Sequence, residues 1–332
     1  MINNRSATKR EIEDDLMKTF PSLAASKLVL LMLVAFVIYC GQTAAQTAEV
    51  EKKSRVTWEW NDDGWKRRLE IQGKAEFTED YTDISSVTEG SVVRIEEDQH
   101  GQSRKLEVSR GAGGPLSRRY FVNGELRPLD DAGRKWLAGL LLIAVRQGAF
   151  DADNRTQTIL RKHGVDGVLA EITQITGEYA KRVYFQALLK NENLGSSEFP
   201  KILQALSTQI SSDHEKANLL KSSAELFLND ARLSNAFFQA VRTVGSDHER
   251  RRTLSSLLST KNLREETWLQ MLETAASISS DYEKATFLLE ASKIFELNTR
   301  VRDAFLKTVE TIKSDHERGR VLNALLRNKQ LS

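Results

Sequence analysis

The chain has 332 residues, of which 40% are hydrophobic and 28% are charged; this is the composition of a folded protein long enough for two domains. Its 48 lysines and arginines nearly balance its 46 aspartates and glutamates, so net charge predicts neither nucleic-acid binding nor a cation store. The single cysteine, Cys40, excludes a disulfide framework within the chain.

The first element in chain order is an apolar segment. Residues 28–40 (LVLLMLVAFVIYC) are the most hydrophobic stretch, and extension back to Phe20 gives a length that can span a membrane. Five lysines and arginines in residues 1–27 favour a cytoplasmic leader, which places the rest of the chain in the periplasm. We therefore expect a single-pass protein held in the membrane by residues 20–40. Cleavage after this segment and secretion to the periplasm is the alternative.

A β-rich region follows from Val56 to Leu129. Its segments alternate apolar and polar residues, as in VTWEW, GSVVRIEED and RKLEVS, and turn sequences such as NDDG and NGE separate them. We predict five or six short antiparallel strands in a small sheet or sandwich. Trp58, Trp60 and Trp65 could stack on a sugar or a peptide, but packing at the core and edge of a small sheet explains them more simply.

The helical part opens with two connecting helices. Asp130 or Asp131 can cap the first, whose ten apolar residues WLAGLLLIAV are too few to span a bilayer. We expect this helix to lie buried between the sheet and the helices that follow. The second helix is predicted to end at Gly164, with His163 in its last turn as a charge partner and not as a ligand.

A motif then recurs five times, as TGEYAK, SSDHEK, GSDHER, SSDYEK and KSDHER. Its acidic residues lie 35, 34, 34 and 34 residues apart: Glu178, Asp213, Asp247, Asp281 and Asp315. A period near 34 with helical texture predicts an α-solenoid of helix–turn–helix repeats. One bulky residue recurs eight positions after each helix cap and is predicted to be the central core position: Phe185, Leu220, Leu254, Leu288 and Leu322.

In four copies the motif has the form of a capping box, with serine before the helix and glutamate three residues later. The four predicted pairs of helix caps are Ser212 and Glu215, Ser246 and Glu249, Ser280 and Glu283, and Ser314 and Glu317. In such a box the serine oxygen accepts from the glutamate N–H, and the glutamate carboxylate accepts from the serine N–H. The aspartate between them is expected to face the positive end of the helix dipole and to pair with the Lys or Arg three residues later.

The motif also places a ring directly after the acidic residue: Tyr179, His214, His248, Tyr282 and His316. A histidine followed by glutamate invites comparison with the zinc motif H-E-x-x-H. The position of its second histidine is filled by other residue types in the three copies: Asn218, Arg252 and Arg320. A position shared by His and Tyr suits a ring packed against the preceding helix. We therefore predict no metal ligand in the repeats.

Other signatures of chemistry are missing from the sequence, which has no P-loop, dinucleotide fingerprint, cysteine pair or G-x-S-x-G elbow. We expect no catalytic residue and no cofactor. Arg250, Arg251 and Arg252 could bind an anion, although a solvated helix face is the simpler interpretation.

The fifth copy is predicted to supply a helix from Ser314 to about Asn328, with no second helix after it. Its apolar stripe is a candidate partner surface: Val321, Leu322, Leu325 and Leu326. Two outcomes are open. The helix can tilt inward and bury the whole stripe, or the stripe can mediate self-association or capture a partner helix.

The order of these features resembles an uncharacterised family of bacterial extracytoplasmic regions that follow BlaR-type antirepressor membrane metallopeptidases or a lone membrane helix. The resemblance rests on AEFTEDYTDISSVTEGS, RRYFVNGELRP, RKWLAGLL and the SDHE or SDYE repeats, and it covers roughly residues 55–332. The zinc motif and the several membrane helices of the peptidase are missing here. The resemblance therefore implies a sensor-like or scaffold-like region and transfers no catalytic residue.

The sequence thus predicts an α+β protein with an N-terminal membrane helix, a small antiparallel β-domain and a C-terminal α-solenoid. The expected organisation is a cytoplasmic leader over residues 1–19, a membrane anchor or signal segment over 20–45, a tether and β-domain over 46–129, bridging helices over 130–176 and solenoid repeats over 177–332. We expect a non-enzymatic binding or scaffold module with a protein partner, such as the sensory region of an envelope signalling system. The alternatives are an extracytoplasmic hydrolase with its site between β-domain and solenoid, and a structural spacer.

Overall fold

The computed structural model describes residues 55–62, 64–294 and 299–327, and Ser54–Ser332 form one compact unit. Within these described ranges, no helix is long and apolar enough to cross a membrane. The predicted leader and membrane segment, including Cys40, lie outside the described residues.

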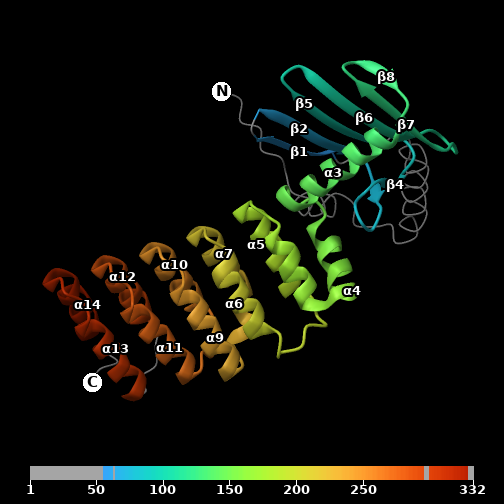
Figure 1. The fold of residues 1–332 in the computed structure, drawn as a ribbon. Helices are drawn as coiled ribbons and strands as arrows, with labels where there is room; N and C mark the ends of the chain where they lie inside the picture. Colours follow the sequence, from blue (N-terminus) through green and yellow to red (C-terminus); the bar gives the residue numbers. More distant parts are fainter. Residues whose placement is uncertain (1–54, 63, 295–298, 328–332) are drawn as a thin grey trace, which may run out of the picture. The chain divides into compact units, whose positions relative to one another are not determined.

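A six-stranded antiparallel sheet forms the first part of the described chain (Figure 1). In spatial order its strands are β1 (Arg55–Asp62), β2 (Trp65–Gln72), β5 (Val92–Gln99), β6 (Gln102–Arg110), β7 (Leu116–Val122) and β8 (Glu125–Arg127). The strand register sets one apolar residue of each central strand opposite the next: Leu69, Ile95, Leu106 and Tyr120. Because side chains alternate along a strand, this row faces one side of the sheet. The prediction of an antiparallel β-domain is confirmed.

A separate hairpin pairs β3 (Ala75–Phe77) with β4 (Ile84–Val87). These strands have three and four residues, which is too short for the alternation that marks longer strands in a sequence. Ile84 and Val87 are nevertheless buried in the same core as the sheet.

Helix α3 (Asp131–Gln147) lies on the apolar face of the sheet (Figure 1). Asp130 caps it by accepting a hydrogen bond from the Gly133 N–H at 2.8 Å. A Cβ atom on Gly133 would lie 2.9 Å from Leu129 and 3.1 Å from Tyr120, so glycine lets the helix approach the sheet closely. The predicted bridging helix is therefore an integral layer of the β-domain.

Helix α4 (Ala152–Thr173) begins the helical stack, by which we mean α4 to α14. Its predicted end at Gly164 coincides with a break in the helix, and a second helical segment continues to Thr173. Gly164 has φ 65° and ψ −167°, which breaks the helical geometry locally and is accessible to glycine at little cost. The sequence signal therefore marks the end of the first of two helical segments that meet at a kink.

The remaining helices stack in two layers (Figure 1). The first helices of the repeats are neighbours in one layer: α5 (Glu178–Leu189), α7 (Asp213–Ser223), α10 (Asp247–Leu257), α12 (Asp281–Ala291) and α14 (Asp315–Arg327). The second layer continues α4 with α6 (Phe199–Gln209), α9 (Ala231–Arg242), α11 (Glu265–Ala276) and α13 (Thr299–Glu310), while the short α8 (Glu225–Leu228) follows α7. The C-terminal region is helical, as predicted.

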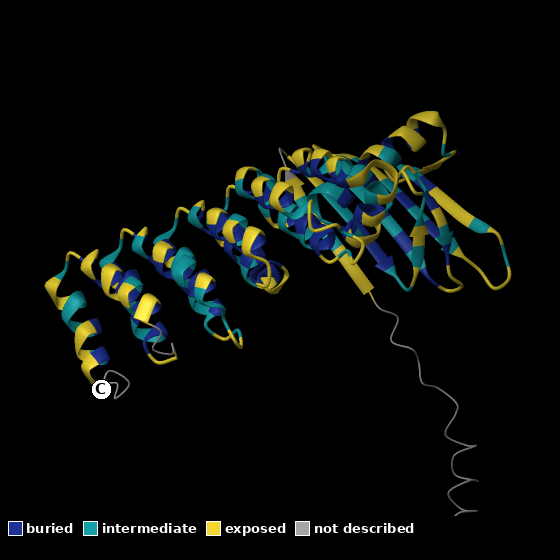
Figure 2. Cartoon of the chain, turned by 90° about the horizontal axis from the view of Figure 1, so that it is seen from below, coloured by how far each residue is buried: buried dark blue, intermediate teal, exposed yellow. Residues whose placement is uncertain are grey.

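One continuous apolar core runs between the two layers, and Figure 2 shows buried positions on helix sides that face neighbours. Phe185, Leu220, Leu254 and Leu288 are all completely buried, as their position eight residues after the helix cap predicts. Full burial of such a side chain contributes about 1.5–3 kcal/mol to stability. Leu322 is the exception and remains 39% exposed, so the core prediction is wrong for the fifth copy.

Candidate functional site

The repeated motif lies where the first helices begin, and its serines cap them. In four copies the serine Oγ accepts a hydrogen bond from the glutamate N–H three residues later at 3.3 Å: Ser212 and Glu215, Ser246 and Glu249, Ser280 and Glu283, and Ser314 and Glu317. An oxygen at this position satisfies a backbone donor that the helix itself leaves unpaired. This is the serine half of the expected box.

The glutamate half of the box is wrong. The N–H of each capping serine donates to an acidic residue of the preceding repeat: Ser212 to Glu178 at 2.9 Å, Ser246 to Asp213 at 2.7 Å, Ser280 to Asp247 at 2.7 Å and Ser314 to Asp281 at 2.8 Å. Stacking brings the start of one first helix beside the loop that enters the next. The acidic side chain therefore reaches a backbone donor in the next repeat. A capping box within one helix does not predict this contact. Each repeat thus caps its successor.

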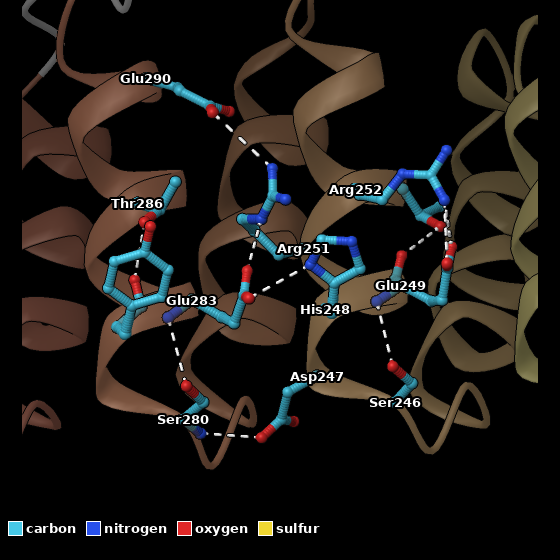
Figure 3. Close-up of polar contacts among 12 residues, drawn as sticks. Ser246, Asp247, His248, Glu249, Arg251, Arg252, Ser280, Glu283, Thr286 and Glu290 are labelled. Carbon is cyan, nitrogen blue, oxygen red and sulfur yellow. Dashed lines mark hydrogen bonds and ion pairs between the residues drawn. The ribbon is translucent and has the colours of Figure 1, made fainter.

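The glutamates instead join basic side chains along the layer of first helices (Figure 3). Glu283 accepts from Arg251 at 2.6 Å and lies 3.2 Å from Nδ1 of His248. Glu249 accepts from Arg252 at 2.8 Å and lies 3.3 Å from Nδ1 of His214. Burial opposes ionisation of Glu249, but the hydrogen bonds from His214 and Arg252 outweigh it and lower its pKa.

The rings of the motif face solvent. We call them the ring row: Tyr179, His214, His248, Tyr282 and His316, each with a side chain more than half exposed. The expectation that they pack against the preceding helix is wrong, because His214 and His248 lean toward a glutamate of the following repeat. The Arg182 guanidinium lies 5.0 Å from the ring centre of Tyr179, a cation–π contact. In the described part of the chain, no three His, Cys, Asp or Glu side chains are grouped to hold a metal ion.

The basic residue of the motif binds the ends of second helices. Lys216 donates to the Thr243 carbonyl at 3.2 Å, and Lys284 donates to the Thr311 carbonyl at 3.1 Å. Both lysines are buried, and burial lowers the pKa of each despite the opposing aspartate nearby. The expected pairing with the aspartate on the same helix is therefore secondary to contact with the negative end of a second helix.

The three consecutive arginines are engaged with protein groups. Arg250 donates to the Val244 carbonyl at 2.6 Å, Arg251 to Glu283 and Arg252 to Glu249. These contacts do not support an anion site. The tryptophans point to packing as well, since Trp58 lies edge-on to Phe150 with ring centres 4.8 Å apart and Trp60 packs against the core.

The predicted partner surface on α14 divides into a buried and an exposed half. Val321 and Leu325 are buried against the stack, whereas Leu322 and Leu326 are 39% and 78% exposed. Burial of the whole stripe, one of the two open outcomes, is therefore wrong for Leu322 and Leu326. The Asp315 carboxylate on the same helix is 96% exposed, compared with 22% for the equivalent Asp247.

The junction between β-domain and stack holds a buried polar cluster. Glu171 accepts from Arg155 at 2.7 Å and from Arg146 at 2.8 Å, and Tyr81 donates to the Asp151 carboxylate at 2.7 Å. Burial opposes ionisation of Glu171, but the hydrogen bonds from both arginines prevail and lower its pKa. Burial raises the pKa of Tyr81, and Asp151 adds to this effect. This is where the alternative hydrolase site was expected.

Sequence reasoning missed this junction cluster. Arg155 and Glu171 are 16 residues apart on α4, and Tyr81 and Asp151 are 70 residues apart, with no motif around them. The one available signal was the kink at Gly164, which allows Arg155 and Glu171 to meet although they lie on the two halves of the helix.

The face of the sheet opposite α3 carries charged residues. Glu70 is bound by Arg68 at 2.9 Å, by Arg55 at 3.1 Å and by Arg94 at 3.2 Å. A shallow hollow of about 740 Å³ lies at one end of this face, with Lys66, Glu96, Lys105 and Phe121 among its lining residues. Two of these lining residues, Lys105 and Glu96, already form an ion pair with each other at 3.2 Å.

Comparison of the chain with protein-family models, with curated proteins and with solved structures finds no match.

Proposed function

We propose that this protein is a membrane-anchored, extracytoplasmic and non-enzymatic binding module, in which an α-solenoid of about 34-residue repeats presents a partner-binding surface. The apolar stretch at residues 28–40 supports the anchor. The resemblance to extracytoplasmic regions behind antirepressor peptidases supports a sensory or scaffold role in envelope signalling.

The observation that carries the proposal is the ring row. Its five rings recur once per first helix, so neighbouring rings follow the helix packing distance of about 8–10 Å. Paired Arg and Glu side chains surround them, as Arg251 and Glu283 surround His248. Tyrosine and arginine are residue types enriched in protein–protein interfaces, and a stack that holds such side chains in place reduces the ordering cost of binding. The favoured partner is another envelope protein that lies along the row.

The junction favours binding over catalysis. A hydrolase of the expected kind needs a general acid with a raised pKa or a base near neutrality. Glu171 has a lowered pKa between two arginines, and Tyr81 has a raised pKa, so each keeps one protonation state across the physiological range.

Site-specific photo-crosslinking tests the proposal. A benzophenone amino acid replaces Tyr282 in the ring row or, as the matched control, the exposed Gln239 on α9 in the other layer. We expect irradiation of native membranes to give a discrete crosslinked protein from position 282 and not from position 239. Equal products from both positions, or none from 282, would contradict partner binding along the row.

The anchor has a separate test. The full-length protein should remain in the membrane pellet after alkaline carbonate extraction, because an apolar helix of this length stays inserted. A variant with Leu31→Arg and Val34→Arg should be released. Release of the unsubstituted protein would favour the secreted alternative.

A further inference from the structure

The outward side of α14 exposes Asp315 and His316, which are equivalent to residues with which earlier first helices contact their successors. We propose that this side is a docking site for the N-terminal end of a helix from a partner protein. The partner helix donates its first backbone N–H groups to Asp315, presents a glutamate at its third position to His316, and covers Leu322 and Leu326 with its apolar side. We call these four residues the terminal face. The proposal deepens the binding function proposed above and specifies a second contact.

The acidic residue gives the first part of the match. At four successive positions its carboxylate accepts N–H groups at the start of the next first helix: Glu178 from Ser211 and Ser212, Asp213 from Gly245 and Ser246, Asp247 from Ser280, and Asp281 from Lys313 and Ser314. Asp315 occupies the fifth such position, contacts Arg318 of its own helix at 3.5 Å and is 96% exposed. Its carboxylate is thus available for a helix N-terminus, for which an anion is the favoured partner.

The histidine gives the second part. His214 and His248 each lie within 3.3 Å of the glutamate at the third position of the following first helix. His316 lies 3.1 Å from Glu317 of its own helix, and its side chain is 79% exposed. A partner glutamate at the equivalent position would take His316 as its partner by a rotation of an exposed side chain.

The apolar residues give the third part. Leu254 and Leu288 occupy the position of Leu322 in earlier repeats and are completely buried, whereas Leu322 and Leu326 are exposed. A helix that follows the pattern of the stack would remove both leucines from water, at about 25 cal/mol per Å² of apolar surface.

A second copy of the chain is a poor occupant. The N–H groups at the starts of its stacked first helices already donate: Gly177 to Gln147, Ser212 to Glu178, Ser246 to Asp213, Ser280 to Asp247 and Ser314 to Asp281. A second copy could therefore present the start of a first helix to the terminal face only by opening one of its own repeats. A different polypeptide with a free helix start, serine or a similar cap and a glutamate three residues later fits the chemistry.

The direct test uses a synthetic peptide of residues 260–293 as the probe, because it carries α11 and the capped start of α12. We expect the fluorescent peptide to bind the full-length protein in detergent saturably. Asp315→Asn should weaken binding by about tenfold, since it removes the charged acceptor of the N–H group that Ser280 donates to Asp247 in the stack. Asp303→Asn, an exposed aspartate on α13, is the control and should change nothing. Saturable binding that Asp315→Asn leaves unchanged would overturn the proposal.

A second test joins the peptide to the protein, in case the free peptide does not fold alone. The same 34 residues, appended after Arg327, continue the repeat in register, since Asp315 aligns with Asp247. We expect the extended protein to melt at a higher temperature, and Asp315→Asn to remove most of the gain. An extension that gives no gain in melting temperature would refute the docking site.

Light scattering of the full-length protein tests whether a second copy of the chain occupies the terminal face. We expect one chain per micelle. A dimer that Leu326→Glu dissociates would show that a second copy fills the terminal face and would overturn the partner version. Failure of all these tests leaves the ring-row crosslink unaffected, because Tyr282 lies outside the terminal face.

Discussion

In the β-domain, charged side chains on the open face of the sheet converge on shared partners, whereas in the helical stack the acidic residues of the motif join one repeat to the next. Glu70 alone binds three arginines from three strands. Asp247, by contrast, holds the cap of the following helix, and an equivalent contact recurs along the stack. The ion pairs of the sheet are shared among several strands. In the stack, each acidic residue of the motif contacts the start of the next first helix, so each repeat depends on its predecessor. This difference predicts where single substitutions have large effects.

The largest effect is expected at the boundary of the two regions. Glu171→Gln leaves Arg146 and Arg155 without an anion in a buried site and should destabilise the protein by about 3 kcal/mol or more. Denaturant unfolding of the two proteins, with and without the substitution, measures it. The sheet provides the control, since Glu59→Gln affects an exposed carboxylate 3.5 Å from Arg68 and should cost less than about 1 kcal/mol. Equal losses of unfolding free energy would show that the ion pairs at the junction contribute no more to stability than those on the open sheet face.

The same carboxylate predicts a dependence on pH. The pKa of Glu171 is lower in the folded state than in the unfolded chain, so the unfolded chain binds more protons in acid. Its contribution to stability is therefore complete above the unfolded pKa, about 4.3, and is lost as pH falls through the lower folded value. Glu171→Gln should flatten the acid limb of a plot of melting temperature against pH.

The next effect compares two copies of one motif. Asp247→Ala removes the charged acceptor of the Ser280 N–H at the start of α12, and should cost about 1.5–3 kcal/mol. Asp315→Ala changes the same motif residue in the last copy, where the carboxylate is almost fully exposed, and should cost less than about 0.5 kcal/mol. Thermal melts of the two variants check this difference. Equal losses would mean that the contact between repeats contributes nothing beyond the local helix start.

These contacts mark how far the sequence alone could lead. The serine caps and the strands were predictable, because each depends on neighbours within one turn or one alternation. The period was predictable because the motif itself recurs in the sequence. The roles of Asp247 and Glu283 were not, because their partners belong to adjacent repeats and are 33 and 32 residues away. A fixed period implies that equivalent residues line up, but only the packing of the helices decides which side chain reaches which donor.

A smaller effect concerns the caps themselves. Ser246→Ala removes the acceptor of the Glu249 N–H and should cost about 1 kcal/mol. Ser279→Ala, an exposed serine just before the Ser280 cap, is the matched control and should be neutral. Equal melting temperatures for the two variants would count against the cap.

The smallest effect is expected in the ring row. His248→Ala removes an exposed ring whose contact with Glu283 is one of two that this carboxylate makes, while Arg251 retains the stronger one at 2.6 Å. Stability should therefore change by less than about 0.5 kcal/mol, as for most surface substitutions.

The same variant tests the ring row as a protein-binding surface and the motif as a zinc site. If the rings bind a partner, His248→Ala should reduce crosslinking from position 282 without a change in melting temperature, and the purified protein should contain no stoichiometric zinc before or after substitution. About one zinc per chain, lost on His214→Ala or His248→Ala, would overturn the reading of the histidines as surface rings, because stoichiometric zinc that depends on one imidazole requires that imidazole as a ligand.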